Sequence, residues 1–309
     1  LRAIPVSKRL EKVSKKDTYE RTMLHYAATA SSASSLPVLK LILTMYPTES
    51  ECLRAVCTQD EDGNTVLHNA ANSANPETIK YILAVLPKSQ HLQIVNTRDH
   101  RGRTVLHRAA RTGNLESLKT ILSVYPETDY LEAISVQDAN GWTILHHVAH
   151  SGNLESMKVL LSLYPESEHF RAVNGLSYKR TTPFHLAAHS DNIEFIQYIL
   201  TYLTVSERLE TVSIEDSGRW NALRHAARSK NPESMKCIIT LLTESFHTQS
   251  ECIQHRIGGV VLHAMVEMNI PGLSAFIFTL LPESLIKQIA EEHSDDGRTV
   301  FHRAARSGN

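Results

Sequence analysis

A short phrase of small, apolar and histidine residues returns along this chain at almost constant spacing. It reads TMLHYAA, TVLHNAA, TVLHRAA, TILHHVA, TPFHLAA, NALRHAA, VVLHAMV and TVFHRAA. Its fourth position, the anchor, falls at residues 25, 68, 107, 146, 185, 224, 263 and 302, so that successive anchors lie 43 and then six times 39 residues apart. A period of this length predicts a stack of similar supersecondary units that bury their apolar faces against one another, rather than a pair of globular domains.

Each repeat carries the pattern of a turn followed by two helices. A turn with an aspartate and a glycine precedes the phrase, at residues 60–63, 99–102, 138–141 and 295–297. Around the anchor, apolar or small residues at positions −1, +2 and +3 form one narrow stripe on a helix, which predicts a buried first helix. After a break with Asn, apolar residues with helical spacing predict a second helix, as over residues 115–125.

A third helix is predicted where each repeat is longer than two helices require. The second helix ends near a proline that is followed by an acid, as at Pro126, Pro165 and Pro282. Proline and an acidic residue are both preferred in the first turn of a helix. Apolar residues such as Leu131 and Ile134 follow at helical spacing, so we expect a short helix there.

The phrase T-x-L-H-x-A-A with an upstream D-x-x-G resembles the ankyrin repeat, and the resemblance covers essentially the whole chain. It implies an all-α solenoid of helix-turn-helix repeats with loop fingers, together with the family's role in protein–protein interaction. The usual period of the family is about 33 residues, and the surplus here falls in the expected third helix. Arrays of this longer period resemble those in effectors of intracellular bacterial pathogens.

We expect a single array over residues 1–309. Its repeats are expected at about 17–59, 60–98, 99–137, 138–176, 177–215, 216–254 and 255–293, with a truncated repeat at 294–309. Residues 1–16 match in spacing the third-helix segment of later repeats, so we expect them to be the tail of a preceding repeat in a longer protein. In the fifth repeat Ser177 and Arg180 replace the aspartate and glycine of the turn, which predicts a non-standard finger.

Charge and composition limit the possible partners and locations. The formal net charge is −1, so the overall field that would concentrate a protein on nucleic acid or on an anionic membrane is missing. No apolar stretch approaches the length of a spanning helix, and the four cysteines form no CxxC pair and no metal-finger spacing. We therefore expect a cytoplasmic protein in a reducing compartment, in the host cytosol if it is a secreted effector.

Residues for catalysis are not apparent. Nucleophile-elbow, P-loop, dinucleotide-binding, zincin and kinase motifs are absent, so no enzyme activity and no cofactor are expected. Seven of the 17 histidines occupy the anchor, where the family resemblance implies a structural hydrogen-bonding role. His146, His147, His150 and His189 are candidate metal ligands, but no carboxylate or thiolate accompanies them at ligand spacing, so we expect no metal site.

A partner-binding surface is predicted on the side of the first helix that faces away from the buried stripe. Positions +1, +4 and +5 from the anchor lie there and are expected to line the concave face. From the third to the sixth repeat, positions +1 and +4 are largely basic, and the fingers add arginines and both tryptophans, a composition typical of interface hot spots. The predicted partner-binding residues are Arg101, Arg103, Arg108, Arg111, Trp142, His147, His150, Tyr178, Lys179, His189, Trp220, His225 and Arg228.

The sequence thus predicts a non-catalytic, monomeric protein-binding module, part of a bacterial effector that binds a host protein. The expected ligand is an acidic or phosphate-bearing segment of the partner, and its affinity is expected to rise as the pH falls from about 7.5 to 6 and histidines gain charge. In one alternative, the array positions a catalytic domain outside residues 1–309. In another, the basic strip binds nucleic acid, although the near-neutral net charge argues against this.

Overall fold

The computed structural model describes residues 6–30, 35–190, 192–228, 232–244, 246–268, 272–292 and 299–307. Within these ranges the regular structure is entirely helical, which confirms the expected all-α repeat fold. The chain divides into two compact units, Leu1–Leu163 and Tyr164–Asn309.

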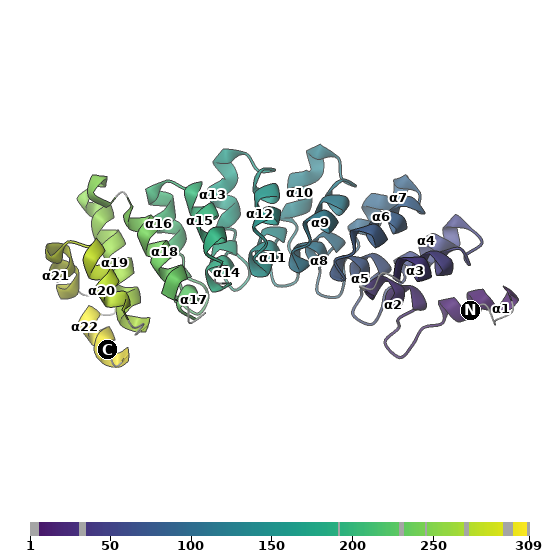
Figure 1. Cartoon of the computed structure of the whole chain (residues 1–309), viewed down its shortest axis with the longest axis horizontal. Coiled ribbons are helices and arrows are strands. Elements are labelled where there is room, and N and C mark those ends of the chain that lie inside the picture. The colour runs from purple at the N-terminus through teal and green to yellow at the C-terminus, as the bar shows by residue number, and fades with distance from the viewer. Residues whose placement is uncertain are drawn as a thin grey trace. The chain divides into compact units, whose positions relative to one another are not determined.

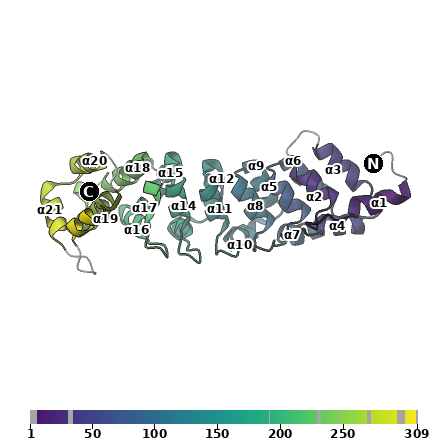
Figure 2. The same cartoon turned by 90° about the horizontal axis from the view of Figure 1, so that it is seen from below.

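The first unit consists of three rows of helices (Figures 1 and 2). First helices pack side by side in the order α2 (Met23–Thr29), α5 (Val66–Asn72), α8 (Val105–Thr112) and α11 (Ile144–Ser151). Second helices form the next row, with α3 (Ser35–Leu43), α6 (Pro76–Ala84), α9 (Leu115–Leu122) and α12 (Leu154–Leu161). The expected third helices are present as α1 (Val6–Ser14), α4 (Glu49–Cys57), α7 (Lys88–Val95) and the pair η1 (Glu127–Asp129) and α10 (Tyr130–Ser135).

The second unit repeats this arrangement. Its first helices are α14 (Pro183–His189), α17 (Ala222–Arg228), α19 (Glu251–Met268) and α22 (Val300–Ser307). Its second helices are α15 (Ile193–Thr201), α18 (Pro232–Thr243) and α20 (Leu273–Leu280). The third-helix segments are η2 (Glu166–Glu168) with α13 (His169–Val173), α16 (Val205–Ser213), η3 (Phe246–Thr248) and α21 (Glu283–Glu291).

Membrane-spanning helices were sought in the same residue ranges. No single helix among the described residues has the length and apolar character needed to cross a membrane. The consecutive helices α20 and α21 pass that test only when taken together, across a bend of 114°.

One predicted turn does not form. The repeat pattern predicts a finger before His263, but α19 runs without a break from Glu251 to Met268, and the expected repeat boundary at residues 254/255 lies inside it. No aspartate stands at the turn position, and Val260 stands where other repeats have the threonine that caps the first helix. Without these polar groups to bond the backbone, nothing in the sequence interrupts the helix.

The anchor histidines tie each first helix to the next repeat, as expected from the family resemblance. In α8 the backbone N–H of Thr104 donates to Nδ1 of His107 over 3.1 Å, so the ring proton resides on Nε2. That Nε2–H donates to the backbone carbonyl of Val136, 3.1 Å away and directly ahead of the next finger. In the preceding repeat the Nε2–H of His68 donates to the carbonyl of Arg103 in the following repeat, over 3.0 Å. The same threonine-to-Nδ1 hydrogen bond recurs, and the ring is fully buried, at His25, His68, His146 and His185.

Burial fixes these imidazoles in the neutral form. It lowers the pKa of His68 and of His185 to about 4, and that of His107 to about 3. A second proton on the ring would remove the acceptor that Nδ1 presents to the threonine. The histidine therefore plays the part that glutamate or glutamine plays in an ordinary capping box, and it reaches across to the neighbouring repeat as well.

The fingers have the same turn with or without glycine, so the predicted non-standard finger of the fifth repeat is wrong. The N–H of Gly141 donates to the carbonyl of Asp138 over 2.9 Å, and the N–H of Arg180 donates to that of Ser177 over 2.9 Å. Arg180 adopts the left-handed conformation, with φ of 56°. Such a residue costs roughly 1–2 kcal/mol. Two hydrogen bonds between Ser177 and Thr181, 3.0 Å each, hold the turn nevertheless.

Neighbouring fingers are joined by backbone hydrogen bonds. In the first unit the N–H of one finger donates to a carbonyl of the preceding one at Glu61 to Tyr19 (3.0 Å), His100 to Asp62 (2.9 Å) and Ala139 to Arg101 (2.8 Å). In the second unit Ser217 donates to Lys179 over 2.9 Å. Each finger is therefore positioned both by its own turn and by the finger before it.

We expect the free energy of unfolding to fall as the pH is lowered from about 6.5 towards 4. The anchor histidines stay neutral in the folded state but take up protons in the unfolded chain below its ordinary pKa, so the unfolded state binds more protons in this window. His107→Gln keeps the capping group but cannot titrate, and it should flatten the decline. Urea unfolding of both proteins across this range measures the effect, and parallel pH profiles would contradict it.

The turn geometry predicts opposite effects for two substitutions. Gly63→Ala should destabilise by about 2 kcal/mol or more, because φ is +80° and the new Cβ would lie 2.6 Å from the backbone nitrogen of His100. Arg219→Gly should be neutral or stabilise by up to about 1 kcal/mol, because it relieves a left-handed arginine (φ 58°) at the entropic cost of glycine. Urea denaturation measures both, and a loss of stability in the second variant would contradict this account.

Candidate partner-binding face

All of the predicted partner-binding residues lie on the finger loops and the first helices. We call this surface the finger face. In the first unit it comprises residues 17–22, 60–65, 99–104 and 138–143 with α2, α5, α8 and α11, and in the second unit residues 177–182 and 216–221 with α14 and α17. In the first unit the finger loops and the third helices α7 and α10 lie at opposite edges of the stack (Figure 1).

An aspartate organises each finger that has one. Oδ1 of Asp138 accepts hydrogen bonds from the backbone N–H of Asn140 (2.8 Å) and of Trp142 (3.0 Å). Asp216 makes the equivalent bonds to Gly218 (2.8 Å) and Trp220 (2.9 Å). The same carboxylate-to-backbone pattern occurs at Asp17, Asp60 and Asp99. This use of Oδ1 leaves Oδ2 available to the first helix.

Oδ2 of the aspartate takes a side-chain hydrogen bond from position +1 of the first helix, nine residues further along the chain. We call this contact the finger latch. It joins Tyr26 to Asp17 (2.6 Å), Arg108 to Asp99 (2.8 Å), His147 to Asp138 (3.0 Å) and His225 to Asp216 (3.0 Å). Sequence reasoning missed the latch, although the recurring nine-residue spacing between the aspartate and a hydrogen-bond donor could have revealed it.

The latch corrects the prediction of an open surface for part of the basic row, namely for His147 and Arg108 at position +1 and for Arg103 in the finger. His147 is only 4% exposed, and Arg103, from the finger itself, is 6% exposed with its Nε 2.9 Å from Oδ2 of Asp99. Arg108 is largely buried as well and bonds both Asp99 and Asn64. The finger covers these side chains because its aspartate hydrogen-bonds them and holds them against the loop. Their visible role is structural, and any contact with a partner stays a prediction.

The other predicted residues do reach the surface. Arg101, Arg111 and His150 are exposed in the first unit, and Tyr178, Lys179, His189 and Arg228 are exposed in the second. Trp142, Trp220 and His225 are half-buried. The accessible part of the predicted surface is therefore the +4 row of the first helices, the finger tips and one side of each tryptophan.

The same side-chain cluster occurs once in each unit. In the first unit the ring of Trp142 lies 5.2 Å from that of His147 and 5.7 Å from that of His150, measured between ring centres. In the second unit the ring of Trp220 lies 5.8 Å from that of His225, and the guanidinium of Arg228 lies 5.6 Å from the tryptophan ring centre. Trp220, His225 and Arg228 lie two 39-residue periods after Trp142, His147 and His150. In both units the tryptophan packs against a latch histidine and against an imidazole or cationic side chain at position +4.

A side chain of the preceding repeat acts on each latch histidine: the charge of Arg111 acts on His147, and the ring of His189 lies 6.3 Å from that of His225. Burial lowers the pKa of His147, and the nearby charges of Arg103 and Arg111 lower it further, against the opposing effect of Asp138.

Burial likewise lowers the pKa of His225, with further lowering by His189 and Arg228 against the effect of Asp216. We name Arg111, Trp142 and His150 the first cluster, and His189, Trp220 and Arg228 the second cluster. Each contains one arginine, one tryptophan and one histidine.

The pKa shifts of two histidines work against the predicted pH dependence of binding. Burial lowers the pKa of His147 and of His225, so both gain less charge between about pH 7.5 and 6 than an ordinary histidine would, and their Nε2 atoms bond aspartates. The pH dependence of binding itself stays a prediction.

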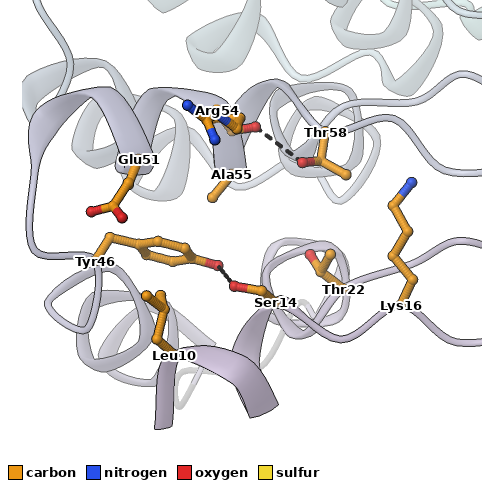
Figure 3. A pocket seen from close by; sticks show the side chains of 9 residues that line it. All are labelled: Leu10, Ser14, Lys16, Thr22, Tyr46, Glu51, Arg54, Ala55 and Thr58. Atoms are coloured by element: carbon orange, nitrogen blue, oxygen red, sulfur yellow. Dashed lines mark hydrogen bonds between the residues drawn. The ribbon is translucent and has the colours of Figure 1, made fainter. Parts of the chain in front are cut away.

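Three cavities formed by described residues lie along the third helices. One of about 320 Å³ is lined by residues of α1, α4 and the neighbouring loops (Figure 3). Its polar groups are largely bonded to one another or to the backbone: Ser14 Oγ donates to Tyr46 Oη (3.4 Å), Thr58 Oγ1 donates to the carbonyl of Arg54 (3.0 Å), and Lys16 Nζ lies 3.1 Å from Glu20. None of the predicted partner-binding residues lines it.

The four histidines considered as metal ligands take other roles. His146 caps its helix through Nδ1, and His147 bonds Asp138. Among the described residues, no group of three or more histidine, cysteine or acidic side chains is arranged to hold a metal ion.

Comparison with known families agrees with this architecture. The sequence model described as ankyrin repeats (3 copies) matches residues 24–130 and, a second time, residues 127–207, which together make up more than half of the chain. The chain therefore belongs to the ankyrin-repeat family. No curated protein sequence matches it significantly. Ankyrin repeats are generally modules of protein–protein interaction.

Breaking one latch should destabilise the array. In Asp138→Asn the NH2 group of the new amide would replace Oδ2, which accepts the hydrogen bond from Nε2–H of His147. Because Nδ1 of His147 already has no hydrogen-bond partner, the buried imidazole would then be left unpaired. We expect a loss of about 1–3 kcal/mol in urea unfolding. Asp62→Asn, at an exposed finger tip, should stay within about 0.5 kcal/mol of the wild type. Equal losses in the two variants would show that the latch has no special role.

Proposed function

We propose that this chain binds an acidic or phosphate-bearing segment of another protein through the finger face, with the first cluster as the main contact in the first unit and the second cluster as the main contact in the second unit. The observation that carries the proposal is the recurrence of one arginine, one tryptophan and one histidine at three equivalent positions of the two units, with the arginine and the histidine exchanged between the units. The family's general role in protein–protein interaction supports it.

The construction of each cluster suits a binding hot spot. The tryptophan follows a finger whose backbone is fixed by Asp138 or Asp216, and its ring packs on the latch histidine. Little conformational freedom is left to lose on binding, which lowers the entropic cost of the contact. Tryptophan and arginine are also the residues whose truncation at interfaces most often costs 2 kcal/mol or more.

The charges favour an anionic ligand. His150 packs beside Trp142, and Arg228 packs beside Trp220. The charge of Arg111 acts on the latch histidine His147, and the ring of His189 lies 6.3 Å from that of the latch histidine His225. The aspartates beneath them are engaged by backbone N–H groups and by the latch histidines. A guanidinium can bind a carboxylate or a phosphate with two parallel hydrogen bonds, while the indole packs on the adjoining part of the ligand chain.

The biological setting that we propose is that of an effector acting as a monomer in the cytosol of a host cell. It rests on the resemblance of the 39-residue period to arrays in effectors of intracellular bacterial pathogens. In the same setting the array could deliver a partner to a catalytic domain outside residues 1–309, and the finger face would then be the recruiting surface.

Binding of a glutamate-rich peptide and of its phosphoserine counterpart, followed by fluorescence anisotropy, tests the proposal. Arg111→Ala and Trp142→Ala should each weaken binding about tenfold or more. Lys119→Ala removes an exposed cation from the second helix α9 and should leave the affinity within about twofold. Circular dichroism checks that each variant is folded.

Two outcomes would contradict the proposal. Unchanged affinity in Arg111→Ala and Trp142→Ala, and in the second-cluster variants Trp220→Ala and Arg228→Ala, would remove the finger face as the binding surface. Tighter binding of single-stranded DNA than of either peptide, lost steeply with added salt, would favour the nucleic-acid alternative.

A further inference from the structure

The first-repeat end of the finger face differs from the rest of that face in the first unit. Tyr19, at the finger tip, is 51% exposed, and Tyr26, at position +1, is 53% exposed. Two repeats further on, the equivalent positions hold Arg101 and Arg108. At the finger tip and at position +1, the side chains are therefore aromatic in the first repeat and basic in the third.

The two tyrosines are held in place by the finger, and we call them the tyrosine patch. Tyr26 Oη donates to Oδ2 of Asp17 over 2.6 Å, which forms the finger latch of this repeat. The guanidinium carbon of Arg21 lies 5.4 Å from the ring centre of Tyr19, and its Nε lies 3.5 Å from Asp60 of the next finger. Both rings thus present ordered apolar surface to solvent, as an anchor pocket for a ligand side chain requires.

The repeat between the tyrosine patch and the basic residues is polar and contributes no cation at these positions. It places Asp62 at the finger tip, Asn69 at position +1 and Asn72 at position +4. A ligand that follows the finger face of the first unit therefore meets aromatic, then polar, then cationic side chains.

The spacing of the helices sets the length of such a ligand. Helix α2 packs on α5, and α5 packs on α8, and packed helices lie about 8–10 Å apart. The tyrosine patch and Arg111 on α8 are therefore separated by roughly 16–20 Å along the stack. An extended chain advances about 3.3 Å per residue and covers that distance in about five or six residues.

We infer that the first unit recognises an extended segment in which an aromatic or aliphatic anchor residue lies about five or six residues from a cluster of acidic residues. The anchor packs on Tyr19 and Tyr26, and the acidic cluster meets Arg111 and its neighbours. A helical ligand would need a groove, and the grooves described in this unit lie along the third helices instead. The inference that the ligand contains an acidic cluster rests on the proposed function. The inference that it contains an anchor residue rests on the tyrosine patch alone.

Three synthetic peptides test the inference by fluorescence anisotropy against the whole chain. One carries only a glutamate cluster, one adds a phenylalanine about six residues from that cluster, and one places the phenylalanine next to the cluster. The second peptide should bind about tenfold more tightly than the other two, since a buried aromatic anchor typically contributes at least this much.

The matched variants separate the two halves of the site. The double variant Tyr19→Ala/Tyr26→Ala should abolish the advantage of the spaced anchor and leave binding of the glutamate-only peptide unchanged. Tyr26→Phe keeps the ring and removes only the hydroxyl that bonds Asp17, so it controls for damage to the finger. Tyr202→Ala removes an equally exposed tyrosine of the second unit, 51%, and should have no effect.

The outcomes distinguish the inference from the proposed function. An anchor advantage that survives in the double variant, or that does not depend on spacing, overturns the inference alone. Binding of the glutamate-only peptide that is unaffected by Arg111→Ala and Trp142→Ala overturns the proposed function of the first cluster. If the wild type sediments as a dimer and the double variant as a monomer, the tyrosine patch is a contact between copies of the chain, and the inference is overturned.

Discussion

The buried anchor histidine is the contact on which the stacking of the repeats depends. Its two ring nitrogens face in opposite directions: Nδ1 accepts from the N-cap threonine of its own helix, and Nε2 donates to a carbonyl of the following repeat, as in His25 to Asn64 and His68 to Arg103. Because each repeat contacts mainly its neighbours, the array has no common core, and such bridges must recur at every step. Around His263, where the turn aspartate and the capping threonine are both missing, the finger is replaced by the uninterrupted helix α19.

A second polar contact gives the finger face its character. The finger aspartate uses one oxygen to hold its own turn and the other to hold position +1 of the first helix, as Asp138 does with Trp142 and His147. A row of basic residues that the sequence presents as an open binding surface is therefore partly internal scaffold. What this scaffold supports is the tryptophan beside it, together with the residues at +4, and those are the groups that remain available to a partner.

Membership of the ankyrin-repeat family and the repeated cluster point to the same kind of activity from independent observations. The family gives the general role in protein–protein interaction, and the clusters give a surface with arginine, tryptophan and histidine in fixed positions. The tyrosine patch at the other end of the first unit adds a contact of different chemistry. A surface with two chemistries discriminates between ligands better than charge alone, because a ligand must satisfy both contacts at one spacing.

The sequence by itself determined the repeat, its period and the three helices of each repeat, because all of these depend on local patterns that recur in register. The structural role of the anchor was implied by the resemblance to the ankyrin repeat. It could not show that Arg103 and His147 are buried, because their burial depends on a finger aspartate that folds back over the first helix. Nor could it show that Arg180 adopts the turn of a glycine, since the hydrogen bonds of Ser177 and Thr181 outweigh a local preference. Only the tertiary structure decided which predicted binding residues reach the surface, because the exposure of a side chain is set by what packs against it and not by its position on an isolated helix.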